Sequence, residues 1–382
     1  MNTDCPIESL AIVTPFYPPH VGGVERYAQE FARAAADLGL TVNVITTDAV
    51  RRPLESTDDG VRVLRLPAYN LPMMGSTYPI SLSGWHRAAE LLRCDAVMAH
   101  TRFFMTTPIA AVLAARQGRR ICVVDHGSGP LRSSSVFALA SLAYEHAVTS
   151  ALKRLSPRFF AVSGASADWL RRFNINDAQV VPNGIRLLGE APSRAPDAFA
   201  MPVVFFAGRL IPEKGARQLV EAVERLVREG SNIQLRIAGQ GPLSRLLSER
   251  ASEAGFLKYL GQLSPEQVAA EMASATIFVN PSDYPEGLPT TLLEAGAAAL
   301  PVISTPRGGS VDLIRNGVTG WLIPDNAPGS IASALREVLA QPDEALRRGL
   351  ALFSLVRDRY TWPSIVKKFL AYAGSANSQK VA

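Results

Sequence analysis

Short apolar runs alternate with longer amphipathic stretches along the first half of the chain. The runs are rich in β-branched and aromatic residues and fall at residues 10–14, 41–46, 61–66, 96–99, 121–124, 159–162 and 179–181. Several are apolar without alternation, as in Ile121-Cys122-Val123-Val124, which is typical of a parallel strand covered on both faces. Residues 24–38, by contrast, have helical periodicity. The alternation predicts repeated βαβ units and therefore an α/β fold.

A proline- and alanine-rich stretch, residues 189–197, interrupts this pattern as an interdomain linker would. A second series of apolar runs follows at residues 203–207, 234–238, 257–260, 277–280, 301–304 and 320–323. Helical segments such as residues 216–229 separate these runs, and helices continue from about residue 330 to residue 373. The polar residues 374–380 are expected to fray.

The whole pattern predicts two doubly wound, Rossmann-like domains. The first covers residues 1–190 and the second residues 191–355. We expect a C-terminal helix with its tail, residues 356–382, to pack back on the first domain. Two such domains leave a cleft between them, and ligands of open α/β sheets bind outside the carboxyl ends of the strands. Functional residues are therefore expected in the loops that follow the strands.

The composition is that of a packed globular protein, with 47% hydrophobic and 19% charged residues, which excludes intrinsic disorder. The longest uncharged stretch, residues 66–86, holds three prolines and two glycines and cannot form a transmembrane helix. Residues 1–9 lack the features of a secretory signal, so we expect a cytoplasmic protein. The net charge of +5 is shared by both halves of the chain, and neither half resembles a nucleic-acid-binding tail.

Neither a disulfide framework nor a metal site is expected. The three cysteines, Cys5, Cys94 and Cys122, have no CxxC spacing and are predicted to be inert thiols. The chain has no Asp-x-Asp motif and no His/Asp cluster at metal-ligand spacing. Catalysis is therefore expected to proceed without a bound metal or other cofactor.

Two groups in the first half follow predicted strands. Gly22 and Gly23 open the first predicted helix, where free N–H groups and the helix dipole favour a phosphate; the alternative is an ordinary βα turn. His126 stands between Asp125 and Gly127 at the end of another strand, and its alternative role is a structural hydrogen bond. The other four histidines are weaker candidates.

In the second half, Arg209 and Lys214 follow a buried strand and precede a helix. Together they can clamp phosphate oxygens and oppose charge on a departing diphosphate; the alternative is a solvated charged loop.

The segment 280–295 is the most informative. It places Glu286 before a Gly287-Leu288 turn, Pro289 at the predicted first helical position, and Glu294 one to two turns inside the helix. The turn and the helix N-terminus predict a second anion site. The two carboxylates can accept hydrogen bonds from sugar or ribose hydroxyls; the alternative is a capping Glu plus a surface Glu.

Taken in order along nearly the whole chain, these motifs resemble the GT-B glycosyltransferases, specifically family 4 of the retaining nucleotide-sugar enzymes. The matching pieces are residues 17–27, His126-Gly127, Val162-Ser163, residues 181–184, Gly208-Arg209 with Lys214-Gly215, and residues 286–294. The resemblance implies a first domain that binds the acceptor and a second that binds the nucleotide sugar.

By that resemblance Arg209 and Lys214 hold the donor diphosphate, helped by backbone at Gly22, Gly23 and the turn formed by Gly287, Leu288 and Pro289. Glu294 binds the ribose, Glu286 the transferred sugar, and His126 lies beside the anomeric centre. The base lies near Gly261, Gln262 and Leu263. The implied reaction is a front-face transfer of a hexose that retains the anomeric configuration. GDP-mannose and UDP-sugar donors both remain open, with some preference for mannose.

Family members act on lipid-linked or polysaccharide acceptors at the cytoplasmic membrane face. Residues 131–160 combine apolar side chains with Arg132, Lys153, Arg154 and Arg158 and could dock on anionic lipid; the preferred alternative is a helix that covers the sheet. The proline-rich loop 67–79 is a further candidate for the acceptor site. Two other functions stay open, a nucleotide-sugar epimerase and a catalytically silent nucleotide-sugar-binding protein.

Overall fold

The computed structural model describes residues 7–20, 22–48, 54–73, 76–129, 135–187 and 189–375. Cys5, Val21, Arg132 and the tail beyond residue 375 lie outside the described residues. The chain divides into two compact units, one made of Met1–Gly184 with Trp362–Ala382 and one made of Ile185–Thr361. The chain thus crosses between the units after Gly184 and after Thr361, where the sequence pattern placed boundaries after residues 190 and 355.

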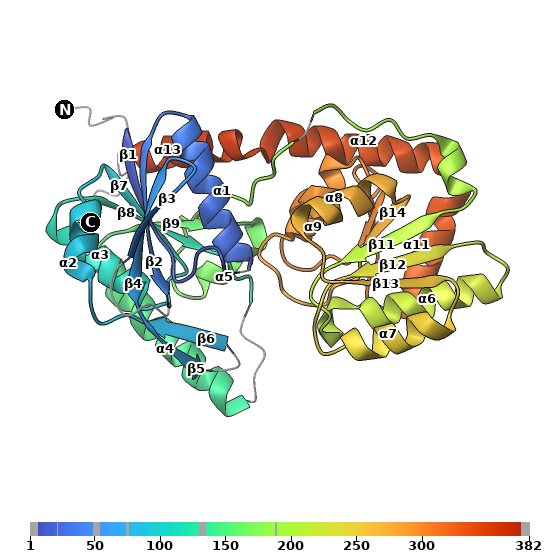
Figure 1. The fold of residues 1–382 in the computed structure, drawn as a ribbon, viewed down its shortest axis with the longest axis horizontal. Coiled ribbons are helices and arrows are strands. Elements are labelled where there is room, and N and C mark those ends of the chain that lie inside the picture. The colour runs from blue at the N-terminus through green and yellow to red at the C-terminus, as the bar shows by residue number, and fades with distance from the viewer. Residues whose placement is uncertain are drawn as a thin grey trace. The chain divides into compact units, whose positions relative to one another are not determined.

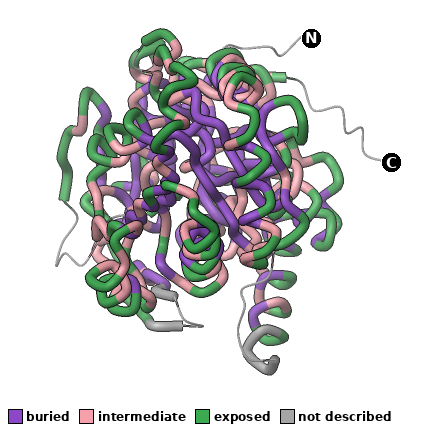
Figure 2. The backbone as a smooth tube through the Cα atoms, turned by 90° about the vertical axis from the view of Figure 1, so that its right-hand side faces the viewer, coloured by how far each residue is buried: buried purple, intermediate pink, exposed green. Residues whose placement is uncertain are grey.

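The first unit is built on an eight-stranded sheet of order β10-β9-β8-β7-β1-β2-β4-β3, in which only β3 is antiparallel. Its strands are β1 Ser9–Val13, β2 Thr41–Asp48, β3 Leu54–Asp58, β4 Val61–Pro67, β7 Ala96–His100, β8 Arg120–Asp125, β9 Arg158–Ala161 and β10 Gln179–Val180. Its helices are α1 Gly23–Asp37, α2 Trp85–Leu91, α3 Thr106–Arg116, α4 Ser135–Lys153, α5 Gly164–Arg171 and α13 Trp362–Gly374. The central strands are buried along nearly their whole length (Figure 2), because both faces of the sheet are covered.

The second unit holds a six-stranded parallel sheet of order β13-β12-β11-β14-β15-β16. Its strands are β11 Val203–Ala207, β12 Gln234–Ala238, β13 Leu257–Gly261, β14 Ile277–Asn280, β15 Val302–Ser304 and β16 Trp321–Leu322. Its helices are α6 Ala216–Arg228, α7 Ser244–Glu253, α8 Pro265–Ser274, α9 Thr290–Ala297, α10 Ser310–Leu313, α11 Pro328–Ala340 and α12 Pro342–Arg359, with 3₁₀ turns Pro196–Phe199 and Pro212–Lys214. Figure 1 shows helices on both sides of this sheet. The α/β prediction is therefore confirmed.

Three strands of the first unit were not predicted. Strand β3 is almost wholly exposed, so it carries no apolar pattern. Strands β5 Tyr69–Met73 and β6 Ser76–Ile80 pair as an antiparallel hairpin, within the stretch 67–79 that was expected to be a loop. A two-stranded sheet has only edges, where proline is tolerated, so the prolines did not prevent pairing.

The proline- and alanine-rich stretch 189–197 belongs to the second unit. Arg194 donates from Nε to the Ala298 carbonyl at 3.0 Å and from Nη2 to the Met272 carbonyl at 2.8 Å. These bonds to helix C-terminal carbonyls hold the stretch against α8 and α9.

Helix α4 covers the sheet of the first unit with one face. Ser141, Glu145, Thr149 and Leu152 are buried, at spacings of three and four residues that place them on one side of a helix. Arg158, which follows α4, donates to the carbonyls of Tyr372 and Ser375 at the end of α13. Arg158 is thus part of the packing of the C-terminal segment. Within the described ranges, no helix combines the length and hydropathy needed to cross a bilayer.

The C-terminal helix α13 packs on α1 (Figure 1). The Phe369 ring lies 5.4 Å from that of Phe31 and 5.2 Å from that of Phe160. Trp362, at the first turn of α13, lies against Gly184, where an added Cβ would come within 2.5 Å of the indole ring. This close approach explains the glycine in the motif 181–184.

We expect Gly184→Ala to destabilise the first unit by about 1–3 kcal/mol, because the new methyl group overpacks the site against Trp362. Urea denaturation followed by tryptophan fluorescence measures this, since Trp85, Trp169 and Trp362 all lie in the first unit. Gly374→Ala is the matched control, because a Cβ there has open space. Equal stability of the two variants would contradict the packing argument.

Candidate functional site

The functional residues predicted in the first unit gather at the carboxyl edge of three adjacent strands, β8, β7 and β1. Helix α1 begins at Gly23, with Gly22 in an extended conformation as its N-cap. His126 follows β8, and His100 ends β7. Because parallel strands present their carboxyl ends at one edge, residues far apart in sequence meet here.

The Glu25 carboxylate lies at the N-terminus of α1, where a phosphate was expected to bind. An added Cβ on Gly22 would lie 2.2 Å from the Glu25 carboxylate oxygen, so this side chain folds back over the first turn of α1. An acid in the first turn is favoured by the helix dipole. A phosphate bound at Gly22 and Gly23 would have to displace the Glu25 carboxylate.

His126 belongs to a cluster of three rings. Its Nε2 lies 2.9 Å from Nδ1 of His100. The Tyr27 ring from α1 meets both imidazoles edge to face, with centroids 4.9 Å from His126 and 5.3 Å from His100. His100 is fully buried, whereas His126 keeps some exposure to solvent.

Both imidazoles are neutral near pH 7. Burial lowers the pKa of His126 to about 4, although Asp125 acts in the opposite direction. Burial also lowers the pKa of His100, and His126 adds to this effect. The unfolded chain binds these protons near pH 6.5. Because the folded state favours the neutral ring, the contribution of His126 to the free energy of unfolding is complete above that pH. This contribution is lost as the pH falls towards 4.

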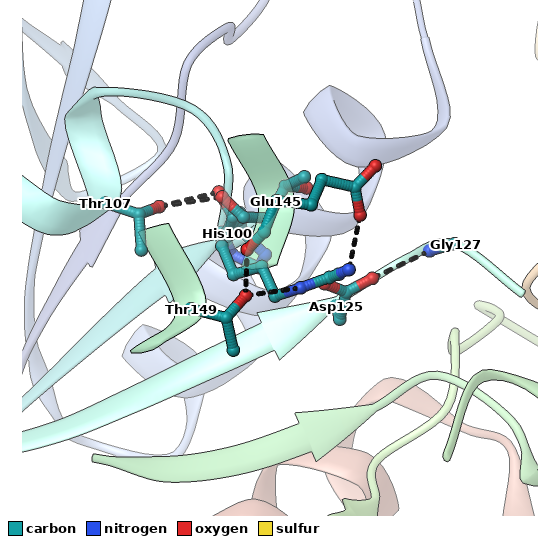
Figure 3. Close-up of polar contacts among 8 residues, drawn as sticks. His100, Thr107, Asp125, Gly127, Glu145 and Thr149 are labelled. Carbon is teal, nitrogen blue, oxygen red and sulfur yellow. Dashed lines mark hydrogen bonds and ion pairs between the residues drawn. The ribbon is translucent and has the colours of Figure 1, made fainter. Parts of the chain in front are cut away.

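A buried ion cluster fixes the loop that carries His126 (Figure 3). Arg102 is fully buried and forms ion pairs with Asp125 and Glu145. Its Nε donates to the Thr149 hydroxyl at 3.1 Å, and its guanidinium lies 4.0 Å over the Phe173 ring. The other oxygen of Asp125 accepts the Gly127 amide at 3.1 Å. Arg102 thus holds the carboxylate that in turn holds the backbone beside His126.

The residue between His100 and Arg102 is strained. Thr101 has a φ of +63°, which is unusual for a β-branched residue and costs on the order of 1–3 kcal/mol. Its amide donates to the Val124 carbonyl at 2.8 Å. The Thr107 hydroxyl donates to the carbonyls of His100 and Thr101, each at 3.0 Å. The end of β7 is therefore held in one conformation.

In the second unit, Lys214 and Glu286 form an ion pair between the loops that follow β11 and β14. The Tyr284 ring joins them, with the Arg209 guanidinium 5.1 Å and the Lys214 ammonium 5.7 Å from its centroid. Lys214 is buried and Arg209 is exposed. The structure thus brings together three of the predicted residues, and its two cations outnumber the Glu286 carboxylate.

Two glycines that were not predicted as site residues contact the backbone of Glu286. Gly308 has a φ of +55°, and a Cβ there would lie 1.9 Å from the Glu286 carbonyl oxygen. The Gly309 amide donates to that same carbonyl at 3.2 Å. The loop after β15 therefore supports the Glu286 backbone.

Pro289 was predicted to occupy the first helical position, and this prediction is wrong. Helix α9 begins at Thr290, and Pro289 is its N-cap with a ψ of 114°, because its extended conformation belongs to the incoming turn. Glu294 lies in the second turn of α9 and is half-buried. Gly287 is half-buried and Leu288 buried in the turn before the helix.

Gly261, Gln262 and Leu263 stand apart from the Lys214 cluster within the same unit. Gly261 ends β13 and the other two follow it, and β13 is two strands away from β11 in the sheet. The Gly261 carbonyl accepts the Gly239 amide at 2.7 Å, and the Gln262 side chain is exposed.

The chain's cysteines and acids form no metal site in the part that the structure describes, where no three His, Cys, Asp or Glu side chains are grouped to hold an ion. Cys94 and Cys122 are buried and free. Burial raises the pKa of Cys94 to about 11 and that of Cys122 to about 12, which keeps both thiols protonated.

Two family models together match most of the chain, one in each unit. Residues 21–187 match the family described as Glycosyltransferase Family 4, and residues 199–350 match Glycosyl transferases group 1. The chain belongs to the family 4 glycosyltransferases. The motifs that suggested this family are therefore correctly recognised, and the two Rossmann-like units are those of the GT-B fold.

Among curated proteins this glycosyltransferase is similar to a GDP-mannose-dependent alpha-mannosyltransferase of Corynebacterium glutamicum, with 28% identity over 95% of this chain and 88% of the relative. It is 26% identical to a GDP-mannose-dependent alpha-(1-6)-phosphatidylinositol monomannoside mannosyltransferase of Mycolicibacterium smegmatis, over 92% and 95% of the two chains. Among solved structures, the sucrose-phosphate synthase of Thermosynechococcus elongatus shares the fold with a TM-score of 0.73, 19% identity, and coverage of 96% and 98%.

We expect Arg102→Met to destabilise the glycosyltransferase by about 3–5 kcal/mol, because it leaves Asp125 and Glu145 buried without their cation. Burial already raises the pKa of Glu145 against the opposing effect of Arg102, and removing Arg102 raises it further. A raised acid pKa means that the folded state takes up the proton first, so the loss of stability shrinks as the pH falls.

Urea denaturation at pH 8 and at pH 5 measures this difference. Arg154→Met, at an exposed position of the same unit, is the control and should leave stability nearly unchanged. An Arg102→Met variant with a pH-independent loss would show that the two carboxylates do not depend on this guanidinium.

Proposed function

We propose that the chain is a retaining, metal-independent hexosyltransferase that moves mannose from GDP-mannose to a hydroxyl of a lipid-linked, polysaccharide or other glycan acceptor. The observation that carries the proposal is the cluster of Arg209, Lys214 and Glu286 around Tyr284. It offers an excess of positive charge beside a carboxylate, which suits a diphosphate attached to a sugar. The choice of GDP-mannose rests on the two mannosyltransferase relatives.

In this proposal Arg209 and Lys214 hold the donor diphosphate, and the amides at the start of α9 add to the positive field. Lys214 is neutralised by Glu286 before the donor binds. When the phosphates take over the ammonium group, the Glu286 carboxylate becomes available to hydroxyls of the mannose. One contact thus prepares both groups, since each charge compensates the other for lost hydration and holds it in place before the donor binds.

Glu294 would accept hydrogen bonds from the ribose hydroxyls, and the backbone of Gly261, Gln262 and Leu263 would contact the base. Gly22 and Gly23 would assist the diphosphate after the Glu25 carboxylate moves aside. His126 would lie beside the anomeric centre and the leaving phosphate. Because its imidazole is neutral, it would contribute a hydrogen bond and no positive charge.

The proposed reaction requires no nucleophile from the protein. The acceptor hydroxyl attacks the anomeric carbon on the face that the nucleotide leaves, and a departing phosphate oxygen takes the hydroxyl proton. The new bond is carbon to acceptor oxygen, and the broken bond is carbon to phosphate oxygen. Stabilisation of the leaving diphosphate and alignment of the two substrates would lower the barrier.

A lipid-linked acceptor would bring the protein to the cytoplasmic face of a membrane. Helix α4 supports this part of the proposal, because Leu139 on it is 71% exposed and Lys153 at its end is exposed with the adjoining Arg154. Apolar and basic side chains on one exposed helix favour anionic lipid surfaces.

We expect GDP-mannose to raise the melting temperature of the protein more than UDP- or ADP-sugars do, and EDTA to leave the shift unchanged. At 100 times Kd, binding adds about 2.7 kcal/mol of stability. Thermal unfolding with each nucleotide sugar, with and without EDTA, measures the shift. A larger shift in melting temperature with UDP-glucose would show that UDP-glucose is the donor in place of GDP-mannose. No shift with any nucleotide sugar would contradict the proposed transferase activity. Conversion of the donor to its epimer without an acceptor would identify an epimerase instead.

We expect Lys214→Met to weaken GDP binding by about 10- to 100-fold, as a charge-assisted hydrogen bond is worth about 1.5–3 kcal/mol. Titration calorimetry measures the affinity. Arg217→Met is the matched control, because Arg217 is an exposed cation three residues away that pairs with Glu221. If both variants bind GDP as the natural protein does, Lys214 does not hold the diphosphate.

A further inference from the structure

His100 leaves His126 only one nitrogen with which to contact a ligand. The 2.9 Å contact joins Nδ1 of His100 to Nε2 of His126. The remaining nitrogen of the His126 ring is Nδ1. Any hydrogen bond from this imidazole to a donor substrate must therefore use Nδ1, and whether it donates or accepts depends on where the ring proton lies.

The neutral pair carries one proton on each ring, and two arrangements are possible. Either His100 donates from Nδ1 and His126 keeps its proton on Nδ1, or His126 donates from Nε2 and His100 carries its proton on Nε2. The second arrangement places an N–H group in the core, because Nε2 of His100 is buried and has no hydrogen-bond partner among the described residues. Buried backbone N–H groups without an acceptor are rarer in proteins than under-satisfied buried carbonyls, and we apply the same order of preference to Nε2 of His100. The first arrangement is therefore favoured.

We propose that His100 is a positioning residue that donates its Nδ1 proton to Nε2 of His126 and thereby holds His126 in the tautomer protonated on Nδ1. This inference rests on the proposed function only for the consequence, which is that His126 presents an N–H donor to the leaving phosphate or the sugar. With Nε2 engaged by His100, the ring neither accepts a proton from the acceptor hydroxyl nor delivers one.

Neighbouring residues hold the two imidazole rings in the orientation that this hydrogen bond requires. The Thr107 hydroxyl fixes the His100 carbonyl at 3.0 Å, and the next residue, Thr101, is held at a φ of +63°. The Tyr27 ring closes the other side of both imidazoles. On the His126 side, Asp125 is anchored by Arg102 and the Gly127 amide. Both rings are thus fixed from their own loops, so the bond between them sets the position of the proton.

The test is the tautomer of His126 in the ligand-free protein. The chain has five histidines, so nitrogen-15 histidine labelling and long-range proton–nitrogen correlation spectra resolve each ring, with His126→Gln assigning the signal. We expect protonated Nδ1 and unprotonated Nε2 for His126. A proton on Nε2 of His126 would overturn the proposal, whatever the substrate of the protein proves to be.

Two near-isosteric variants separate the role from simple packing. His100→Asn places an amide donor where Nδ1 stood, so His126 should keep its tautomer and GDP release from GDP-mannose should stay near the wild-type rate. His100→Asp places an acceptor there and should move the His126 proton to Nε2, with a fall in kcat on the order of 10²-fold, as for the loss of one preorganised donor. His86→Asn, at an exposed histidine, is the control.

GDP binding distinguishes this proposal from the proposed function. All three variants should still bind GDP, since the Lys214 cluster belongs to the other unit. If His100→Asp does not fold, His100→Leu replaces it and should leave His126 with a mixture of tautomers. If the His126 spectrum stays unchanged in His100→Asp, or in His100→Leu where that variant replaces it, His100 does not determine which nitrogen of His126 carries the proton.

Discussion

Burying a polar side chain in a central strand that is covered on both faces costs free energy, so the reactive polar groups of both units lie at or beyond the ends of such strands. Within strands β7 and β8 the side chains are buried almost throughout. A reactive polar side chain in the middle of these strands would therefore lose free energy of hydration. The groups that can react or bind stand at the last residue of a buried strand or directly after it. His100, Asp125 and His126 illustrate this in the first unit, and the loops after β11 and β14 do so in the second.

The two units handle charge at these strand ends in opposite ways. In the first, the only cation near His126 that the described residues show to be fully buried is Arg102, and two carboxylates pair with it. The histidines beside it are neutral, so they offer directed hydrogen bonds without a positive charge. In the second, Arg209 and Lys214 outnumber Glu286.

The sequence predicted the fold well where burial imposes a pattern. Strands β11, β12 and β14 have the predicted bounds, because β11 and most of β14 are apolar on both faces and β12 alternates polar with apolar residues. Strand β3 was missed because its side chains face solvent and carry no such pattern. Lys214 and Glu286 were chosen for their motifs, yet their contact depends on the adjacency of β11 and β14, which the linear order does not reveal. His100 and Arg102 were passed over because their partners lie 26 and 43 residues away. The rule that drew attention to His126, a polar residue at a strand end, applies equally to both.

The return of α13 to the first unit has a consequence for how the chain is made. The second unit is a continuous segment, Ile185–Thr361, whereas the first unit is completed only by residues that follow it. On the ribosome, the part synthesised first must therefore wait for the last helix. Until then the surface of α1 around Phe31, which Phe369 covers in the finished protein, is an open apolar patch. The first unit of this glycosyltransferase is begun first and finished last, and its nascent form is the one that needs protection from aggregation.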